Sequence, residues 1–152
     1  MSRTVEALQA ALAAEHAAVY GYGVVGAGLS GAGQETARLV MNAHRTRRDQ
    51  LTAHLVQRRA RPVAAAAAYR LPVRVTSAKT AAELAAVLED RALAAHLALA
   101  GAEEADLRRY AALAMQEAMS RSVGWRRSAG GRAVPPAFPG LPQGAPAPRS
   151  RR

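Results

Sequence analysis

Residues 62–76 read PVAAAAAYRLPVRVT and separate two long helical patterns from two others. Pro62 ends the preceding helix, since proline cannot supply the amide that a continuing helix needs. About fifteen extended residues reach roughly 50 Å, whereas a helix of about 25 residues is roughly 37 Å long. The chain can therefore cross the whole bundle before the third helix begins. This favours an up-down-down-up arrangement over an up-down-up-down one, which needs only a few connecting residues.

Apolar residues recur at three- and four-residue spacings on both sides of this connection. Before it, the pattern runs from Val5 to Tyr22 and from Ala37 to Leu55. After it, the pattern runs from Ala85 to Leu99 and from Leu107 to Glu117. We therefore predict an all-α bundle of four helices, in which alanine allows close helix approach. Residues 1–128 form this bundle, and residues 129–152 form an irregular Pro/Gly/Arg-rich tail.

Short motifs mark the expected helix ends. Residues 29–33, LSGAG, predict a tight turn before the second helix. The third helix is expected to begin near Thr76 or Ser77, with Thr80-x-x-Glu83 as an alternative capping box. Within the first helix, Gly21-x-Gly23-x-x-Gly26 follows no strand, so it predicts close approach of a neighbouring helix and not a dinucleotide site.

One polar residue lies near the middle of the apolar stripe of each predicted helix. These residues are Glu15, His44, Glu89 and Glu117. Each lies roughly eleven to fourteen residues into its helix, so all four are expected at one level of the bundle. A buried carboxylate must be paired or bound to metal. Three carboxylates and an imidazole suit a single iron or manganese ion.

The alternative is a metal-free ion-pair network. Arg48, Arg91 or Arg121 could neutralise the inward glutamates directly. His96 shares the stripe of Glu89 two turns further on, roughly 10 Å away. We therefore expect His96 to be a hydrogen-bonded core residue and not a ligand of the same ion. Both interpretations stay open on the sequence.

Two segments resemble a known family. Residues 13–23, AAEHAAVYGYG, and 43–49, AHRTRRD, resemble a bacterial branch of the ferritin-like superfamily whose function is unknown. Residues 138–142, FPGLP, are similar to that branch as well, and are apolar enough to dock on the bundle. The resemblance implies a ferritin-like four-helix bundle and allows a homodimer.

The resemblance also implies a depleted metal site. Working di-iron members carry a Glu on helices one and three and Glu-x-x-His on helices two and four. Glu15 and Glu89 match the single glutamates, but Met41 replaces a glutamate and Ser120 replaces a histidine. No catalytic residue is therefore predicted, and at most a single metal ion is expected.

Charge suggests a different class of function. The net charge is +10, from 21 basic and 11 acidic residues. Residues 45–74 carry eight arginines against Asp49, and residues 119–152 carry seven arginines and no acid. Such segments either bind an anionic partner, such as RNA or a ribonucleoprotein, or are simply solvated. No secretory leader or membrane-length apolar run is evident, so we expect a cytoplasmic protein.

Overall fold

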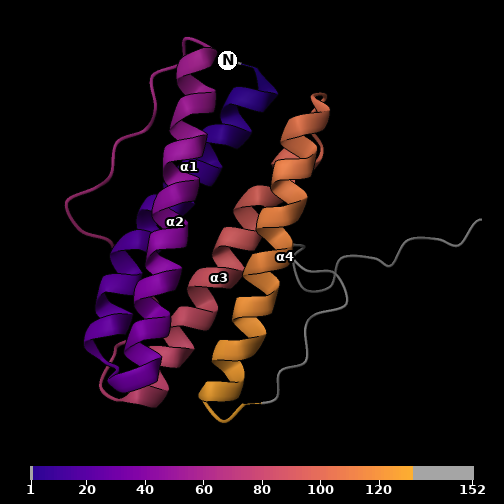
Figure 1. Ribbon diagram of the computed structural model, residues 1–152. Coiled ribbons are helices and arrows are strands. Elements are labelled where there is room, and N and C mark those ends of the chain that lie inside the picture. The colour runs from indigo at the N-terminus through magenta and orange to yellow at the C-terminus, as the bar shows by residue number, and fades with distance from the viewer. Residues whose placement is uncertain (1, 132–152) are drawn as a thin grey trace, which may run out of the picture.

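The computed structural model describes residues 2–131, which contain four helices and no strand (Figure 1). The helices are α1 (Arg3–Ala27), α2 (Gly31–Gln57), α3 (Ala78–Ala100) and α4 (Ala105–Ser128). The prediction of an all-α protein with four helices is confirmed. Most of the predicted tail, including residues 138–142, lies outside the described residues. No helix within residues 2–131 is sufficiently long and apolar to cross a membrane.

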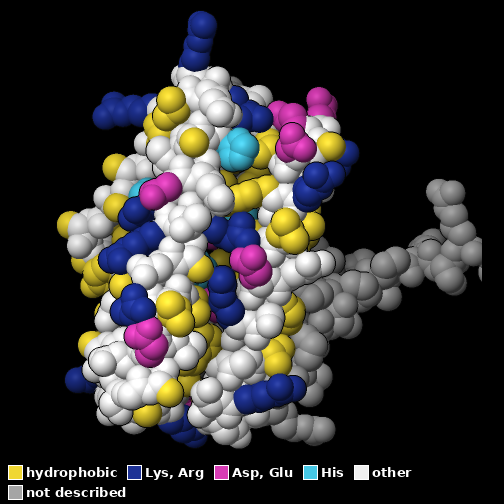
Figure 2. Space-filling model, in the orientation of Figure 1, with side chains coloured by type: hydrophobic (Ala, Val, Ile, Leu, Met, Phe, Trp, Pro, Cys, Tyr) yellow, Lys and Arg dark blue, Asp and Glu magenta, His cyan; other side chains and the backbone are white. Residues whose placement is uncertain are grey.

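Helices α1 and α3 form the centre of the packing, because they contact each other, α1 also contacts α2, and α3 also contacts α4. Helices α1 and α3 run antiparallel, since Tyr22 lies beside Glu89 and Glu15 beside His96. Within residues 2–131, the backbones of α2 and α4 do not approach each other closely. Long charged side chains bridge this α2–α4 seam and gather on the face seen in Figure 2.

The first helix connection is shorter than predicted. The expected turn at residues 29–33 is wrong in extent, since α2 already begins at Gly31. Gly31 has φ +54°, which lets the chain reverse at once without a Cβ clash. The side chain of Gln34 then donates hydrogen bonds to the carbonyl oxygens of Gly26 (2.9 Å) and Leu29 (3.2 Å), which fixes the turn.

The start of α3 is set by a reciprocal cap. The Thr80 amide donates to Ser77 Oγ (3.1 Å), and the Ser77 amide donates to Thr80 Oγ1 (2.9 Å). The predicted start at Ser77 is therefore confirmed, and the alternative capping box of Thr80 with Glu83 is wrong. Thr80 is the last residue of the capping box and not its first, because its hydroxyl accepts a hydrogen bond from the amide of Ser77.

Two apolar clusters fill the bundle, one towards each end. The Trp125 cluster contains Tyr22, Val25, Ala37, Val40, Ala81, Ala82, Leu84, Ala85, Ala86, Leu88 and Trp125, and the Leu107 cluster contains Ala7, Leu8, Ala11, Leu12, Leu51, Leu55, Leu99, Leu107 and Ala111. The predicted close approach of a neighbouring helix is confirmed at Gly21 but wrong at Gly23, where a Cβ would meet nothing within 4 Å. A Cβ built on Gly21 would lie 2.5 Å from Leu88 Cδ1, so no larger residue fits without movement.

The connection from residue 58 to residue 77 contains no helix and runs along the outside of the bundle (Figure 1). The first residues of this connection are attached to α1. Gln9 Nε2 donates to the Arg61 carbonyl (2.7 Å), the Val63 amide donates to Gln9 Oε1 (2.8 Å), and His16 Nε2 lies 2.9 Å from the Val63 carbonyl. Further along, Leu71, Val73 and Val75 pack against the Trp125 cluster. The connection is therefore an ordered part of the fold.

Candidate functional site

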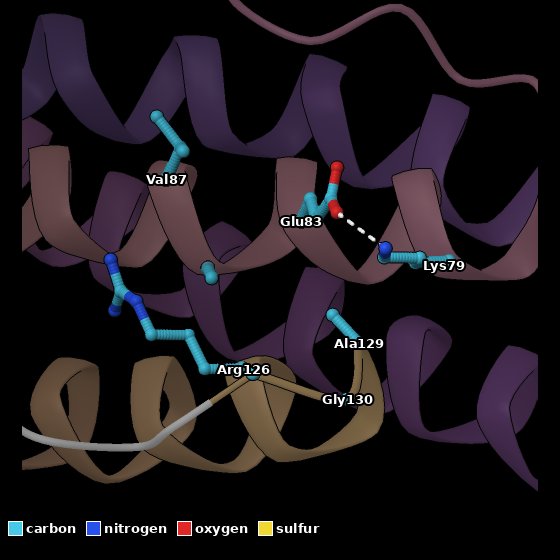
Figure 3. Close-up of a pocket in the computed structure, with 8 residues that line it drawn as sticks. Lys79, Glu83, Val87, Arg126, Ala129 and Gly130 are labelled. Atoms are coloured by element: carbon cyan, nitrogen blue, oxygen red, sulfur yellow. Dashed lines mark ion pairs between the residues drawn. The ribbon is translucent and has the colours of Figure 1, made fainter.

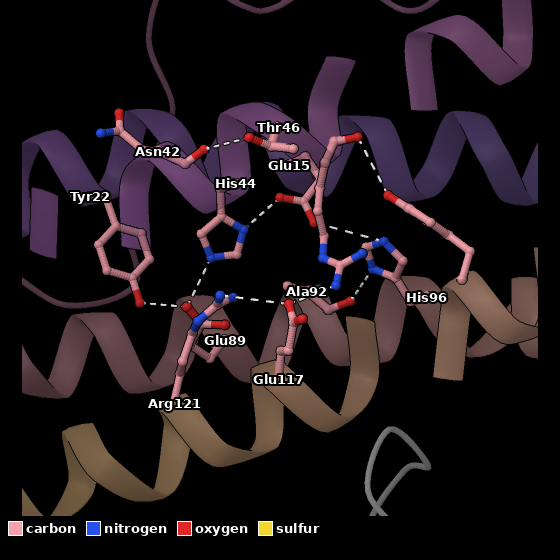
Figure 4. Close-up of polar contacts among 12 residues, drawn as sticks. Glu15, Tyr22, Asn42, His44, Thr46, Glu89, Ala92, His96, Glu117 and Arg121 are labelled. Atoms are coloured by element: carbon pink, nitrogen blue, oxygen red, sulfur yellow. Dashed lines mark hydrogen bonds and ion pairs between the residues drawn. The ribbon is translucent and has the colours of Figure 1, made fainter. Parts of the chain in front are cut away.

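A layer of buried polar side chains separates the two apolar clusters. It consists of Glu15 on α1, His44 on α2, and Glu89 and His96 on α3, none more than 1% exposed. Three of the four residues predicted from the helical stripes thus meet in one place (Figure 4). We call these four side chains the polar layer.

His44 bridges the two buried carboxylates. Its Nδ1 lies 2.5 Å from Glu15 Oε2, and its Nε2 lies 2.8 Å from Glu89 Oε1. Burial alone lowers the pKa of His44, but the hydrogen bonds and charges of the two glutamates outweigh it and raise the pKa from 6.5 to about 9. A neutral imidazole has only one N–H, so donation to both carboxylates requires the imidazolium. His44 is therefore the cation of the polar layer at neutral pH.

Two aromatic residues extend this network to α4. The Tyr22 hydroxyl donates to Glu89 Oε1 (2.5 Å), and Trp125 Nε1 donates to the Tyr22 hydroxyl (3.0 Å). The Tyr22 ring also stacks on His44, with ring centroids 5.3 Å apart. Burial and the charge of Glu89 raise the pKa of Tyr22 well above its usual value, so the hydroxyl keeps its proton and remains a donor. Together these contacts fix the orientation of the Glu89 carboxylate.

His96 has a free ring nitrogen. Its Nδ1 donates to the Ala92 carbonyl (2.8 Å), so in the neutral ring Nε2 carries a lone pair. Burial lowers the pKa of His96, which favours this neutral form. Nε2 lies 3.7 Å from Glu15 Oε1, too far for a hydrogen bond. Two acceptor atoms therefore face each other across the α1–α3 interface.

Three buried polar atoms of the layer have no hydrogen-bond partner in the described part of the chain. They are Glu15 Oε1, Glu89 Oε2 and His96 Nε2. Leaving a buried polar group unpaired costs about 1–3 kcal/mol. The layer also holds more acceptors than donors, because two carboxyl groups share one imidazolium. The polar layer thus lacks a donor or a cation.

Glu117 does not join the polar layer. Its carboxylate is about half-exposed, accepts a hydrogen bond from Arg47 (2.6 Å), and lies 3.6 Å from Arg121. Direct neutralisation by arginine therefore applies to Glu117, with Arg121 as one of two partners. Arg48 pairs with Asp49 instead (2.9 Å), and Arg91 makes no ion pair with any described residue. Glu117 lies at the outer side of the α2–α4 seam.

The chain matches a family across residues 7–143, described as a domain of unknown function, DUF4439. The chain belongs to the DUF4439 family. The crystal structure of a conserved hypothetical protein, rv2844, from Mycobacterium tuberculosis is similar to it, at 40% sequence identity and a TM-score of 0.78. That similarity covers 83% of this chain and 96% of the other. No curated protein matches the chain.

His96 of this DUF4439 chain is, as predicted, a hydrogen-bonded core residue, and it also lies beside Glu15, which the helical stripes alone did not indicate. Its distance to Glu89 along α3 was the basis for excluding it from the site. The seven-residue spacing from Glu15 to Tyr22 on α1 equals the spacing from Glu89 to His96 on α3. In antiparallel helices, equal spacings bring both pairs into register, so Glu15 approaches His96 while Tyr22 approaches Glu89. That equality is the signal that identifies His96 and Tyr22.

The donors of the polar layer suit a hard or borderline divalent cation. Carboxylate oxygens and an imidazole nitrogen are ligands for iron and manganese. As the side chains stand, however, no group of three or more His, Cys, Asp or Glu within residues 2–131 is arranged around a metal position. Of the other two residues predicted as ligands, His44 has both ring nitrogens bonded to Glu15 and Glu89, and Glu117 pairs through Oε2 with Arg47 outside the layer. The residues with free atoms are Glu15, Glu89 and His96.

A separate surface pocket of about 500 Å³ lies where α3 begins and α4 ends (Figure 3). Its charged groups are already paired. Lys79 Nζ lies 4.0 Å from Glu83 Oε1, and Arg126 pairs with Asp90. The other lining residues, such as Val87 and Ala129, are small or apolar. This pocket lacks the converging unpaired groups that mark the polar layer.

Proposed function

We propose that this DUF4439 chain is a ferritin-like bundle whose polar layer binds a single divalent cation, iron or manganese. The ferritin-like arrangement is supported by two helix pairs, α1 with α2 and α3 with α4, joined by a long connection. In this chain α2 and α3 run parallel to each other, because both are antiparallel to α1. The level of the polar layer, midway between the two apolar clusters, is where carboxylate-bridged metal centres of such bundles lie.

One observation carries the proposal: Glu15 Oε1, Glu89 Oε2 and His96 Nε2 are buried without a hydrogen-bond partner among the described residues. A cation would satisfy the lone pairs of all three atoms. The donor set of two oxygens and one nitrogen favours iron or manganese over a soft metal. Because the three atoms are not yet grouped around one point, binding requires a side-chain movement within the layer.

The other residues of the site have distinct roles. His44 neutralises one of the two carboxylate charges and holds Glu15 and Glu89 in place. Tyr22 orients Glu89 through its hydroxyl, and the apolar clusters on either side keep bulk water out. A bound iron or manganese ion would supply a Lewis-acidic, redox-active centre. We assign no reaction to this centre.

Elemental analysis tests the proposal directly. Protein purified without a chelator or an affinity tag is analysed as isolated, and again after anaerobic incubation with ferrous iron or manganese and removal of free metal. We expect up to about one ion per chain, since the layer offers one set of free donors. Glu15→Gln should abolish this uptake, because it removes a charge and a ligand from the centre of the layer.

Glu117→Gln is the matched control, since it makes the same chemical change on the same level but outside the layer. It should leave metal uptake unchanged. Circular dichroism and thermal unfolding of each variant show whether the bundle is intact. A folded wild-type chain that takes up neither metal would overturn the proposal and leave the polar layer as a proton-bridged structural network. Equal loss in both variants would contradict the assignment of ligands.

A further inference from the structure

The long connection between α2 and α3 carries an uncompensated charge. Residues 50–82 contain five arginines and Lys79 but no aspartate or glutamate. Several arginines of the helices are paired with acids, such as Arg47 with Glu117 and Arg126 with Asp90. The charge of the connection therefore faces solvent along one side of the bundle.

Four of these arginines are free. Arg59, Arg61, Arg70 and Arg74 are exposed and form no ion pair with any residue in the described range 2–131. Arg58 differs, because it pairs with Glu104 across the α2–α4 seam (3.0 Å). Free guanidinium groups are available for phosphate, to which they donate two parallel hydrogen bonds.

The free arginines are carried by a backbone that is held in place. The contacts of Gln9 and His16 fix residues 61–63 against α1. Leu71, Val73 and Val75 point to the Trp125 cluster, so the alternate residues Arg70 and Arg74 point outwards. In an extended chain, residues four apart are separated by roughly 13 Å. The connection thus presents a preformed basic track.

An aromatic pair adjoins this track. Tyr20 on α1 and Tyr69 in the connection have ring centroids 5.5 Å apart with an interplanar angle of 55°. Tyr20 is 38% exposed, and Tyr69 is positioned by the hydrogen bond that its hydroxyl accepts from the Ala66 amide (2.9 Å). The pair belongs to neither apolar cluster, and more than a third of Tyr20 is exposed, so part of its surface faces solvent beside the track.

We propose that this surface, formed by Tyr20, Tyr69 and the free arginines of residues 59–74, binds single-stranded nucleic acid. Arginines along an extended track suit a phosphate backbone, and adjacent aromatic rings suit stacking of unpaired bases. The free arginines lie on the non-helical residues 58–77, so they are not carried by a helix that could enter a duplex groove. Nothing in its chemistry distinguishes RNA from DNA. It is independent of the polar layer.

Fluorescence anisotropy with labelled single-stranded oligonucleotides tests this proposal, using RNA and DNA of one mixed sequence and the matching duplex. The full chain is used throughout. We expect stronger binding to the single strands than to the duplex, and a linear fall of log affinity with log salt. Arg70→Gln combined with Arg74→Gln should reduce the salt slope by roughly 1.4, for two lost phosphate contacts on a single strand.

Arg91→Gln combined with Arg109→Gln is the control, because both arginines are exposed, lie on α3 and α4, and make no ion pair among the described residues. This variant has the same net charge as the variant with Arg70→Gln and Arg74→Gln. It should nevertheless bind nearly as well as the parent chain. Tyr20→Leu, which keeps an apolar side chain, should weaken single-strand binding by roughly 5- to 150-fold through lost stacking. All variants are checked for an unchanged helical spectrum.

Three results would overturn the proposal. The first is equal loss of affinity in the two double-arginine variants, which would mean attraction by net charge alone. The second is full binding by Tyr20→Leu, which would remove the stacking argument. The third is tighter binding of the duplex, or of anionic lipid vesicles, than of the single strands. A difference between RNA and DNA would leave the proposal intact and identify the natural strand.

Discussion

Glu15 and His96 face each other across the α1–α3 interface with Oε1 and Nε2 3.7 Å apart, and neither atom has a hydrogen-bond partner among the described residues. Both are acceptors at neutral pH, because the only ring proton of His96 is donated to the Ala92 carbonyl. The contact is unfavourable unless a proton or a cation lies between the two atoms. Its energetics can be measured.

Replacing His96 by leucine should abolish metal binding without lowering the stability of the metal-free protein. His96→Leu removes one unpaired buried acceptor, so the metal-free protein should keep its free energy of unfolding or gain about 1 kcal/mol. The rise in melting temperature that manganese gives the parent chain should disappear, because a ligand is lost. Differential scanning calorimetry with and without manganese measures both effects. Retained stabilisation by manganese in this variant would show that His96 is not a ligand.

Replacing His44 should be far more damaging. His44→Leu leaves Glu15 and Glu89 buried without their shared cation, which should cost about 3–5 kcal/mol of unfolding free energy. Urea denaturation followed by circular dichroism measures the loss. The half-exposed ion pair of Glu117 provides the comparison: Glu117→Gln should cost less than about 1 kcal/mol. Similar losses in the two variants would contradict the central role of His44.

The stability of the metal-free protein should depend on pH in two opposite ways. His44 has a folded pKa of about 9, above its ordinary 6.5, so its contribution is complete below pH 6.5 and is lost as the pH rises through about 9. The pKa of His96 is lowered by burial, so its neutral form costs stability as the pH falls below 6.5. Maximum stability is therefore expected near pH 6.5, since the contribution of His44 falls above this pH and the cost of keeping His96 neutral grows below it.

Denaturation midpoints measured from acidic to alkaline pH test this dependence. The alkaline loss should be about 3 kcal/mol when complete, and it should be absent from the His44→Leu variant. The acidic loss should be smaller in His96→Leu. An alkaline loss that persists without His44 would assign it to another group.

Two glycines of α1 offer a matched test of helix packing. Gly21 faces Leu88 closely, whereas a Cβ on Gly23 would meet nothing within 4 Å. Gly23→Ala should therefore stabilise the protein by up to about 1 kcal/mol through helix propensity. Gly21→Ala receives the same propensity gain but must displace the buried Leu88, at a cost of about 1–3 kcal/mol. Thermal unfolding should rank Gly23→Ala above Gly21→Ala, and the reverse order would refute the close approach.

The helices could be predicted from the sequence, but the polar layer could be predicted only in part. The stripes from Val5 to Tyr22 and from Ala85 to Leu99 follow from local periodicity, and they identify Glu15 and Glu89 as inward residues. Periodicity could not show that Glu117 turns towards Arg47, because that depends on the width of the α2–α4 seam. The role of His96 required the register of α1 against α3. The turn at Gly31 was misjudged because glycine both breaks helices and begins one here at positive φ.

The Arg47–Glu117 and Arg58–Glu104 bridges span two helices whose backbones do not touch within the described residues. The α1–α3 interface, by contrast, is close-packed through Gly21. The bundle is thus held together in two different ways: by close apolar packing between α1 and α3, and by ion pairs between the side chains of α2 and α4. Dissolved salt screens these ion pairs, whereas the apolar packing of α1 and α3 does not depend on charge. We therefore expect rising ionic strength to loosen the α2–α4 seam before the α1–α3 interface.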